Sequence, residues 1–271
     1  MTNINIMYKV IILNKSGKNN KKYIYILMFA IFLFFGISSY IANINYGETL
    51  QVSNLNVSDE FKKLSVAINQ DEYVMQKKEE ETNYYTISVY YPLTKYKIVN
   101  SKINEVITQY VNTLKSSIDD QAKNLITESG YKYFLDIRFN TYNYLDYITY
   151  VLHISTFTGG AHPNSYYYTI TYNKDKMELV TIDNLIKKNK SLLVDLSEYA
   201  YNNLTNNQKI KDIGALDMVK DGTKPTIENF KNLALTSDGI IIFFENYQVA
   251  PYVAGEFAVT VPYDKINLKL N

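Results

Sequence analysis

Alternating apolar and polar positions recur along the chain and predict β-strands. The segment "YYTISVYYP" alternates from Tyr85 to Tyr91, and Pro92 is predicted to end that strand. The same β-like pattern occurs in residues 131–140, 145–158 and 164–173. The last two of these segments are separated by Gly159–Pro163, which we therefore expect to join two antiparallel strands.

Apolar residues spaced three or four positions apart predict two amphipathic helices. The first has Asn100 or Ser101 available as its N-cap and carries Val99, Ile103, Val106, Ile107, Tyr110, Val111, Leu114 and Ile118. The second is predicted to have Asp183 as its cap and carries Leu185, Ile186, Leu192, Leu193, Leu196, Tyr199, Ala200 and Leu204.

The C-terminal part of the chain predicts further strands. Asp238-Gly239 lies between two apolar runs and predicts a hairpin, because glycine tolerates the positive φ of a tight turn. The stretch "GEFAVTVPYDKI" supplies a closing strand. Helices packed on antiparallel sheets define an α+β fold, which we divide into sub-domains at residues 73–172 and 173–271. The pattern leaves open whether the two sub-domains share one sheet.

An uncharged apolar run, residues 23–41, precedes these elements. Its 19 residues would span about 28 Å as a helix, close to the hydrocarbon thickness of a bilayer. The run predicts a transmembrane anchor, with a cleaved signal peptide as the alternative. Lysines but no acidic residues precede it, so residues 1–22 are expected to stay in the cytoplasm as a basic tail. Residues 42–72 are predicted to form an extracellular stalk, and Glu79–Glu81 a solvated loop.

Composition limits the chemistry of the chain. There is no cysteine, which excludes disulfides, thiol nucleophiles and zinc–cysteine sites. Five of the 28 basic residues precede the apolar run, so the rest of the chain carries 23 basic and 27 acidic residues, a net charge of −4. A mildly acidic ectodomain disfavours nucleic acid as a partner and mildly favours a cationic one, although so small a charge is also that of an ordinary soluble surface.

No pattern of catalytic or metal-ligating residues stands out. The two histidines, His153 and His162, are not spaced as metal ligands, and a metal site needs about three protein ligands. Ser155 and Ser165 do not lie in a Gly-x-Ser-x-Gly elbow, and no spacing singles out a pair of carboxylates. We therefore expect no enzyme, no catalytic residue, no metal site and no cofactor.

Two loops are unusual in composition. Gly159-Gly160-Ala161-His162-Pro163 predicts a tight turn that needs positive φ and is stiffened by proline, which accounts for every residue type except the histidine. The second loop lies in "FFENYQVAPYVAGEF", residues 243–257. It separates two predicted strands and carries aromatic residues. A loop of this kind is either a flap that covers a core or a rigid aromatic contact surface.

These two loops carry a resemblance to a known family. "TGGAHPN" followed by a Tyr/Thr strand, and "IIIFFENYQVAPYVAGEFAVTVPY", resemble the paired extracytoplasmic domains of the lysozyme-sensing anti-sigma-V factor RsiV. The same pair precedes the catalytic domain of the peptidoglycan deacetylase PdaC. The resemblance covers about residues 73–268, and the C-terminal motif is the more specific of the two.

The resemblance implies binding of lysozyme, with loops of the ectodomain entering the substrate cleft of that enzyme. The candidate contact residues are Thr158, Gly159, Gly160, His162, Pro163, Glu245, Tyr247, Pro251 and Tyr252. The acidic ectodomain suits this partner, because animal lysozymes are strongly cationic. We expect no deacetylase activity, because the resemblance covers the domain pair and not the catalytic domain of PdaC.

We therefore expect a single-pass membrane protein whose ectodomain binds lysozyme and inhibits it, so conferring lysozyme resistance. An anti-sigma factor of the RsiV type is one alternative, although the tail of residues 1–22 offers little to bind a sigma factor. A peptidoglycan-binding accessory module is the other alternative.

Overall fold

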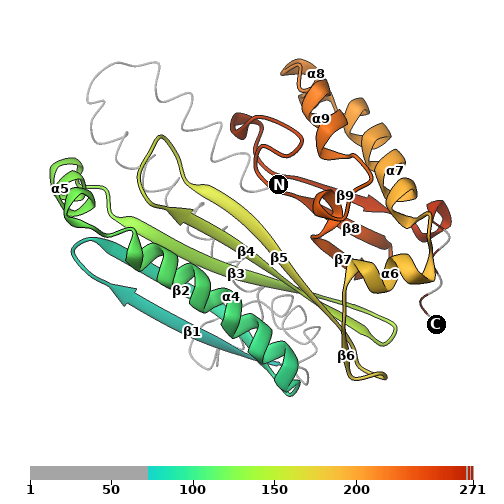
Figure 1. The fold of residues 1–271 in the computed structure, drawn as a ribbon, viewed down its shortest axis with the longest axis horizontal. Helices are drawn as coiled ribbons and strands as arrows, with labels where there is room; N and C mark the ends of the chain where they lie inside the picture. Colours follow the sequence, from blue (N-terminus) through green and yellow to red (C-terminus); the bar gives the residue numbers. More distant parts are fainter. Residues whose placement is uncertain (1–72, 267, 269, 271) are drawn as a thin grey trace, which may run out of the picture. The chain divides into compact units, whose positions relative to one another are not determined.

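The computed structural model describes residues 73–266, 268 and 270 (Figure 1). The predicted tail, transmembrane anchor and stalk, residues 1–22, 23–41 and 42–72, lie outside the described residues. Within the described part, none of the helices combines the length and the apolar character needed to cross a bilayer.

A six-stranded sheet forms the first half of the described chain, with its strands in sequence order. The strands are β1 (Tyr73–Glu81), β2 (Tyr85–Thr94), β3 (Tyr133–Tyr144), β4 (Tyr147–Phe157), β5 (Asn164–Asn173) and β6 (Glu178–Val180). All neighbours are antiparallel except β2 and β3, which are parallel, so the expectation of purely antiparallel sheets is corrected. The cause is the helical crossover between them, α4 (Lys97–Ser116) and α5 (Asp120–Ser129), because parallel strands need such a connection.

Helix α4 packs against one face of this sheet, as Figure 1 shows. The apolar stripe predicted for it is buried, with Val99, Ile103, Val106, Ile107, Val111 and Leu114 in the core. The predicted cap is wrong: the helix begins after Tyr96, and no side chain caps it. The amide of Asn100 instead reaches back from the first turn, accepting a hydrogen bond from the Thr94 backbone N–H at 2.8 Å and donating one to the Thr94 carbonyl at 2.7 Å.

Two local predictions near the first strands are also wrong. Glu79–Glu81 do not form a loop but end β1, because an edge strand can pair its backbone while its charged side chains stay in solvent. Glu80 and Glu81 pair there with Lys115 and Lys132, each at 2.7 Å. Pro92 lies inside β2, opposite Met75. Proline has no backbone N–H to donate, and it is tolerated here because the pairing of β2 with β3 stops at Val89. At Pro92, β2 therefore has no β3 residue opposite it.

The second half combines helices with a separate three-stranded antiparallel sheet. Its strands are β7 (Leu233–Thr236), β8 (Gly239–Phe244) and β9 (Phe257–Val261). Its helices are α6 (Ile182–Lys188), α7 (Leu192–Asn206), α8 (Gln208–Asp212) and α9 (Leu216–Gly222), with the 3-10 turns η1 (Glu228–Phe230), η2 (Tyr252–Ala254) and η3 (Tyr263–Lys265).

The predicted second helix is in fact two helices, α6 and α7. Its predicted cap is also wrong, because Thr181 rather than Asp183 caps α6 and forms a capping box with Asn184. The predicted hairpin at Asp238-Gly239 is confirmed. Gly239 is required there, since its φ is +144° and a Cβ atom would come within 2.1 Å of the Val261 carbonyl oxygen.

The two sheets are separate but packed together. Val151 of β4, Ala234 of β7 and Phe243 of β8 form a small apolar cluster on the face of the large sheet opposite α4. The β4 residue Tyr147 joins the core of the second half and donates a hydrogen bond to the Leu270 carbonyl at 2.9 Å. The large sheet continues to Val180, past residue 172, where the sequence pattern had divided the sub-domains.

Candidate functional site

The turn between β4 and β5 has the backbone that its glycines predicted. Gly159 and Gly160 have φ values of +92° and +99°, which other residues adopt only under strain. A Cβ atom at Gly159 would also come within 3.0 Å of the Tyr133 hydroxyl oxygen, whereas Gly160 faces open space. The turn therefore follows one defined path, with Thr158 and both glycines exposed at its tip.

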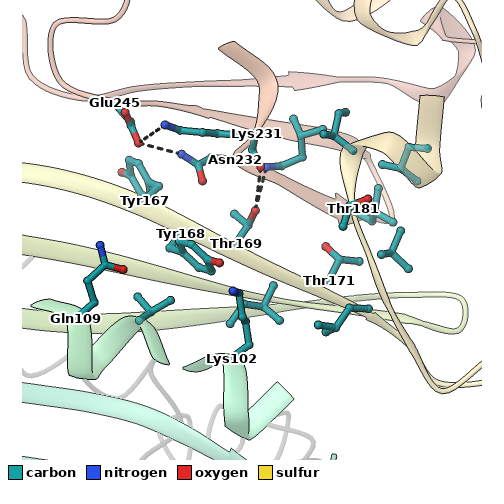
Figure 2. A pocket seen from close by; sticks show the side chains of 18 of the residues that line it. Lys102, Gln109, Tyr167, Tyr168, Thr169, Thr171, Thr181, Lys231, Asn232 and Glu245 are labelled. Carbon is teal, nitrogen blue, oxygen red and sulfur yellow. Dashed lines mark hydrogen bonds and ion pairs between the residues drawn. The ribbon is translucent and has the colours of Figure 1, made fainter. Parts of the chain in front are cut away.

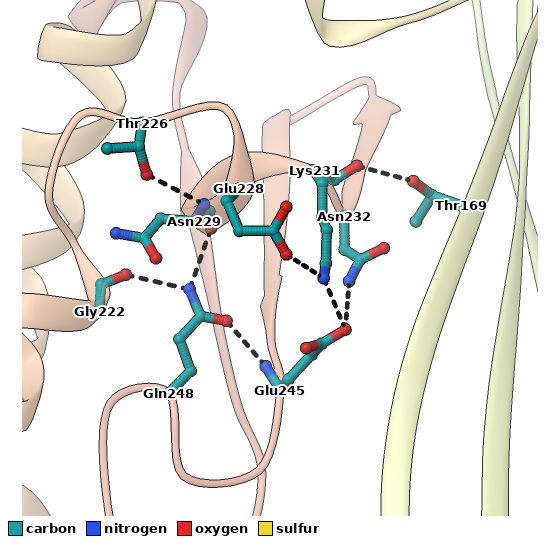
Figure 3. Close-up of polar contacts among 9 residues, drawn as sticks. All are labelled: Thr169, Gly222, Thr226, Glu228, Asn229, Lys231, Asn232, Glu245 and Gln248. Carbon is teal, nitrogen blue, oxygen red and sulfur yellow. Dashed lines mark hydrogen bonds and ion pairs between the residues drawn. The ribbon is translucent and has the colours of Figure 1, made fainter.

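The second unusual loop, residues 245–256, connects β8 to β9 and is held by one glutamine (Figure 3). The Gln248 side chain accepts a hydrogen bond from the Glu245 backbone N–H at 3.0 Å. It donates to the carbonyl oxygens of Gly222 and Asn229, each also at 3.0 Å. Gly222 allows this approach, because a Cβ atom there would lie 2.1 Å from the Gln248 carbonyl oxygen. We call this segment the flap.

The turn and the flap meet at three aromatic side chains. The imidazole of His162 stacks on the ring of Tyr252, with centroids 3.7 Å apart and planes 12° from parallel. The Nε2 atom of His162 lies 2.8 Å from the hydroxyl oxygen of Tyr247. Its Nδ1 atom lies 2.8 Å from the Pro163 carbonyl oxygen, which can only accept. In the neutral ring, Nδ1–H therefore donates to Pro163, and Nε2 accepts from Tyr247.

These three residues form an outward-facing patch, which we call the aromatic surface. Tyr247 is 51% exposed and has a φ of +66°, a left-handed conformation that is uncommon for a tyrosine. Val253, next to Tyr252, is 82% exposed. Pro251 has an extended conformation and leads into η2, which carries Tyr252. A tyrosine in a left-handed conformation is often found at a functional site.

Among the candidate contact residues, Glu245 makes its side-chain contacts with residues outside the turn and the flap. Its carboxylate lies 3.4 Å from the Lys231 ammonium and 3.3 Å from the Asn232 amide nitrogen (Figure 3). The other candidate residues belong to the turn or lie beside the aromatic surface. The sequence grouped Glu245 with them because it stands at the start of the same loop, but its side chain contacts Lys231 and Asn232, which lie outside that loop.

The far end of the flap is held by a polar cluster that the sequence analysis missed. The Glu256 carboxylate lies 2.8 Å from His153 Nε2 and accepts a hydrogen bond from the Tyr167 hydroxyl at 2.5 Å. The hydrogen bond from His153, with a smaller contribution from Tyr167, lowers the pKa of Glu256 to about 2 against the opposing effect of burial. No sequence signal joins these residues, because His153 lies in β4 and Glu256 lies in the flap.

Among the described residues, no group of three or more histidine and carboxylate side chains could hold a metal ion. His153 is engaged by Glu256, and His162 by Tyr247 and Pro163. What the site provides is a fixed surface formed by two loops, each anchored to its own sheet.

Comparison with known proteins gives two family matches. A family model described as deacetylase PdaC matches residues 78–165, and one described as DUF3298, a protein of unknown function, matches residues 183–264. The chain is also 35% identical over 126 residues to the peptidoglycan-N-acetylmuramic acid deacetylase PdaC of Bacillus subtilis (strain 168). That match covers 46% of this chain and 24% of the relative, so the chain spans about a quarter of the relative's length.

Two solved structures are similar to the chain. A DUF3298 family member from Bacteroides fragilis NCTC 9343 has a TM-score of 0.52 at 17% identity, covering 74% of this chain and 94% of that one. Another, from Pseudomonas aeruginosa PAO1, has a TM-score of 0.45 at 14% identity, covering 73% and 94%. The first likeness shows the fold.

The family matches confirm part of the resemblance found in the sequence. Two parts of the described region are similar to the PdaC and DUF3298 families, and the relative that matches is named for its action on peptidoglycan. The similarity to PdaC is therefore confirmed, whereas lysozyme binding of the RsiV type stays a prediction. The relative is named a deacetylase, but no enzymatic activity is shown for the matched region.

Proposed function

We propose that this chain is a membrane-anchored, extracytoplasmic protein that binds lysozyme and inhibits it by occupying its substrate cleft. The observation that carries the proposal is the stacking of His162 on Tyr252. This contact joins the turn and the flap, the two loops that resemble RsiV, into one outward-facing surface. A chain that acts in this way needs no catalytic residue, because it works by excluding the glycan substrate.

The construction of the aromatic surface suits tight binding. Aromatic side chains at the centre of an interface contribute much of its binding free energy. Loops that already hold their bound conformation lose less entropy on association. Gln248 holds one end of the flap and Glu256 the other, so the surface is ordered before a partner arrives. The net charge of −4 beyond the apolar run would also attract a cationic lysozyme.

A direct test mixes the purified full-length chain with hen egg-white lysozyme. We expect a stable complex by size-exclusion chromatography and slower lysis of cell-wall fragments as the chain is added. Heat-unfolded chain at the same concentration controls for non-specific effects of protein. Unchanged lysis in the presence of excess folded chain would exclude the inhibitor function, and absence of a complex would exclude lysozyme as the partner.

A further inference from the structure

The direction of one hydrogen bond in the aromatic surface is set by a neighbouring carbonyl. His162 Nδ1 lies 2.8 Å from the Pro163 carbonyl oxygen, which only accepts, so in the neutral ring Nδ1 carries the proton and Nε2 carries none. The Tyr247 hydroxyl, 2.8 Å from Nε2, therefore donates its single hydrogen to the imidazole. Its oxygen keeps a lone pair, and no other hydrogen bond among the described residues reaches it. Since Tyr247 is 51% exposed, this oxygen offers an acceptor to a partner.

Protonation of His162 would reverse that hydrogen bond. An imidazolium carries a hydrogen on both nitrogens, so Nε2–H would donate to the Tyr247 oxygen and the hydroxyl hydrogen would rotate to the opposite side. The same position on the surface then changes from an acceptor to a donor. Nδ1–H keeps its bond to Pro163, and a charged imidazole still stacks favourably on the Tyr252 ring, 3.7 Å away. Protonation therefore changes the chemistry of the aromatic surface and leaves its shape in place.

A positive charge on His162 would have no carboxylate paired with it. The turn contains no acidic residue, and the flap contains two. Figure 2 shows one of them, Glu245, directed toward Lys231, 3.4 Å away. The other, Glu256, pairs with His153 at 2.8 Å. Within the described part, His162 contacts two phenol rings and a carbonyl and forms no ion pair, so a partner seated on the aromatic surface would meet the charge.

We propose that His162 makes lysozyme binding depend on pH, an inference that rests on the proposed function. When neutral, His162 holds the Tyr247 hydroxyl as an acceptor for an ammonium or guanidinium group of the cationic enzyme. When protonated, it turns that hydroxyl into a donor and places a positive charge against a positive partner. Both effects weaken the complex in acid, because like charges across an interface are costly.

The free chain offers a first test that needs no partner. Nitrogen chemical shifts of His162, measured by NMR on the full-length chain at pH 7.5, should show the neutral tautomer with its proton on Nδ1. The opposite tautomer would overturn the inference, because Nε2 would then already donate to Tyr247. Thermal unfolding at pH 7.5 and pH 5.5 shows whether the chain stays folded over the range in which histidine changes its charge.

Calorimetric titration of the full-length chain with hen egg-white lysozyme at the same two pH values is the second test. We expect binding to be about tenfold weaker at pH 5.5, the loss of one hydrogen bond to a charged group. Near pH 6 the complex should release protons as it forms, because protons and the partner compete for the same surface. Titration in two buffers of different ionisation enthalpy measures that release.

Variants separate His162 from the titratable groups of the enzyme, and the ratio of affinities at the two pH values is the readout. His162→Gln should reduce this ratio and release fewer protons, because an amide does not titrate in this range. Its matched control is the other histidine: His153→Gln should keep the wild-type ratio, whatever its effect on the flap. Tyr247→Phe, which removes only the hydroxyl, should also reduce the ratio and serves if His162→Gln fails to fold.

The outcomes distinguish this inference from the proposed function. A complex at pH 7.5 whose pH dependence is the same in the wild-type chain, His162→Gln and Tyr247→Phe would overturn the inference and leave lysozyme binding in place. Absence of a complex at pH 7.5 would reject the proposed function and the inference with it.

Discussion

The imidazole of His162 stacks on the phenol ring of Tyr252 at 3.7 Å, although the two residues lie in loops anchored to different sheets. The contact means that the position of each loop depends on the other. Tyr247 strengthens the connection through its hydroxyl group, 2.8 Å from His162. Lysozyme binding, if it uses this surface, should therefore respond to changes in either loop.

Tyr252→Ala should weaken lysozyme binding by about 2 kcal/mol or more, because it removes a central aromatic residue and the stacking partner of His162. Tyr131→Ala is the matched control, since Tyr131 is 73% exposed and lies outside both loops. Calorimetry would measure affinity, and thermal unfolding would measure stability. A Tyr252→Ala chain that melts at a lower temperature yet binds normally would show that Tyr252 supports the fold and not the interface.

Gly159→Ala should destabilise the fold more than Gly160→Ala. Both glycines have positive φ, so either change costs about 1 kcal/mol of backbone strain. Only at Gly159 does the new methyl group also meet a side chain, the Tyr133 hydroxyl at 3.0 Å. Urea unfolding of the two variants measures the difference. Equal destabilisation would mean that Tyr133 moves aside without cost.

Gln248→Ala should loosen the flap, because the side chain makes three hydrogen bonds that connect it to Gly222, Asn229 and Glu245. We expect a loss of about 1–3 kcal/mol in the free energy of unfolding and faster hydrogen exchange in residues 245–256. Gln208→Ala is a suitable control, since Gln208 is exposed and its side chain donates a hydrogen bond to Asp212 of its own helix. Unchanged exchange in the flap would contradict its dependence on Gln248.

Glu256 should make stability depend on pH in the acid range. Its folded-state pKa of about 2 lies below the ordinary value of 4.5, so its contribution is fully present above about pH 4.5 and is lost as the pH falls toward 2. Partial exposure of the side chain limits this contribution to about 1–2 kcal/mol.

The comparison of the wild-type chain with Glu256→Gln isolates that contribution. The two chains should differ in free energy of unfolding at pH 7, and the difference should shrink between pH 4.5 and pH 3. Glu178→Gln, a change at an exposed strand end, controls for the loss of one charge. A difference that stays constant down to pH 3 would show that the carboxylate charge is not what matters.

Much of the fold could be predicted from local pattern. Helix α4, the turn at Gly159-Gly160 and the hairpin at Gly239 follow from periodicity and from the backbone freedom of glycine. Strand β1 could not be predicted, because its charged residues pair through the backbone at a sheet edge and show no apolar alternation. The parallel pairing of β2 with β3 could not be predicted either, because the residue pattern of a strand does not specify which strand lies next to it or in which direction.

The sequence by itself determined the two loops, their glycines and prolines, and the kind of side chains they present, because these depend on residues close together in the chain. Only the tertiary structure decided that His162 meets Tyr247 and Tyr252, that Glu256 pairs with His153, and that Glu245 turns to Lys231. Such contacts join distant segments, and they form only where the packing of Val151 against Ala234 and Phe243 brings the two sheets together.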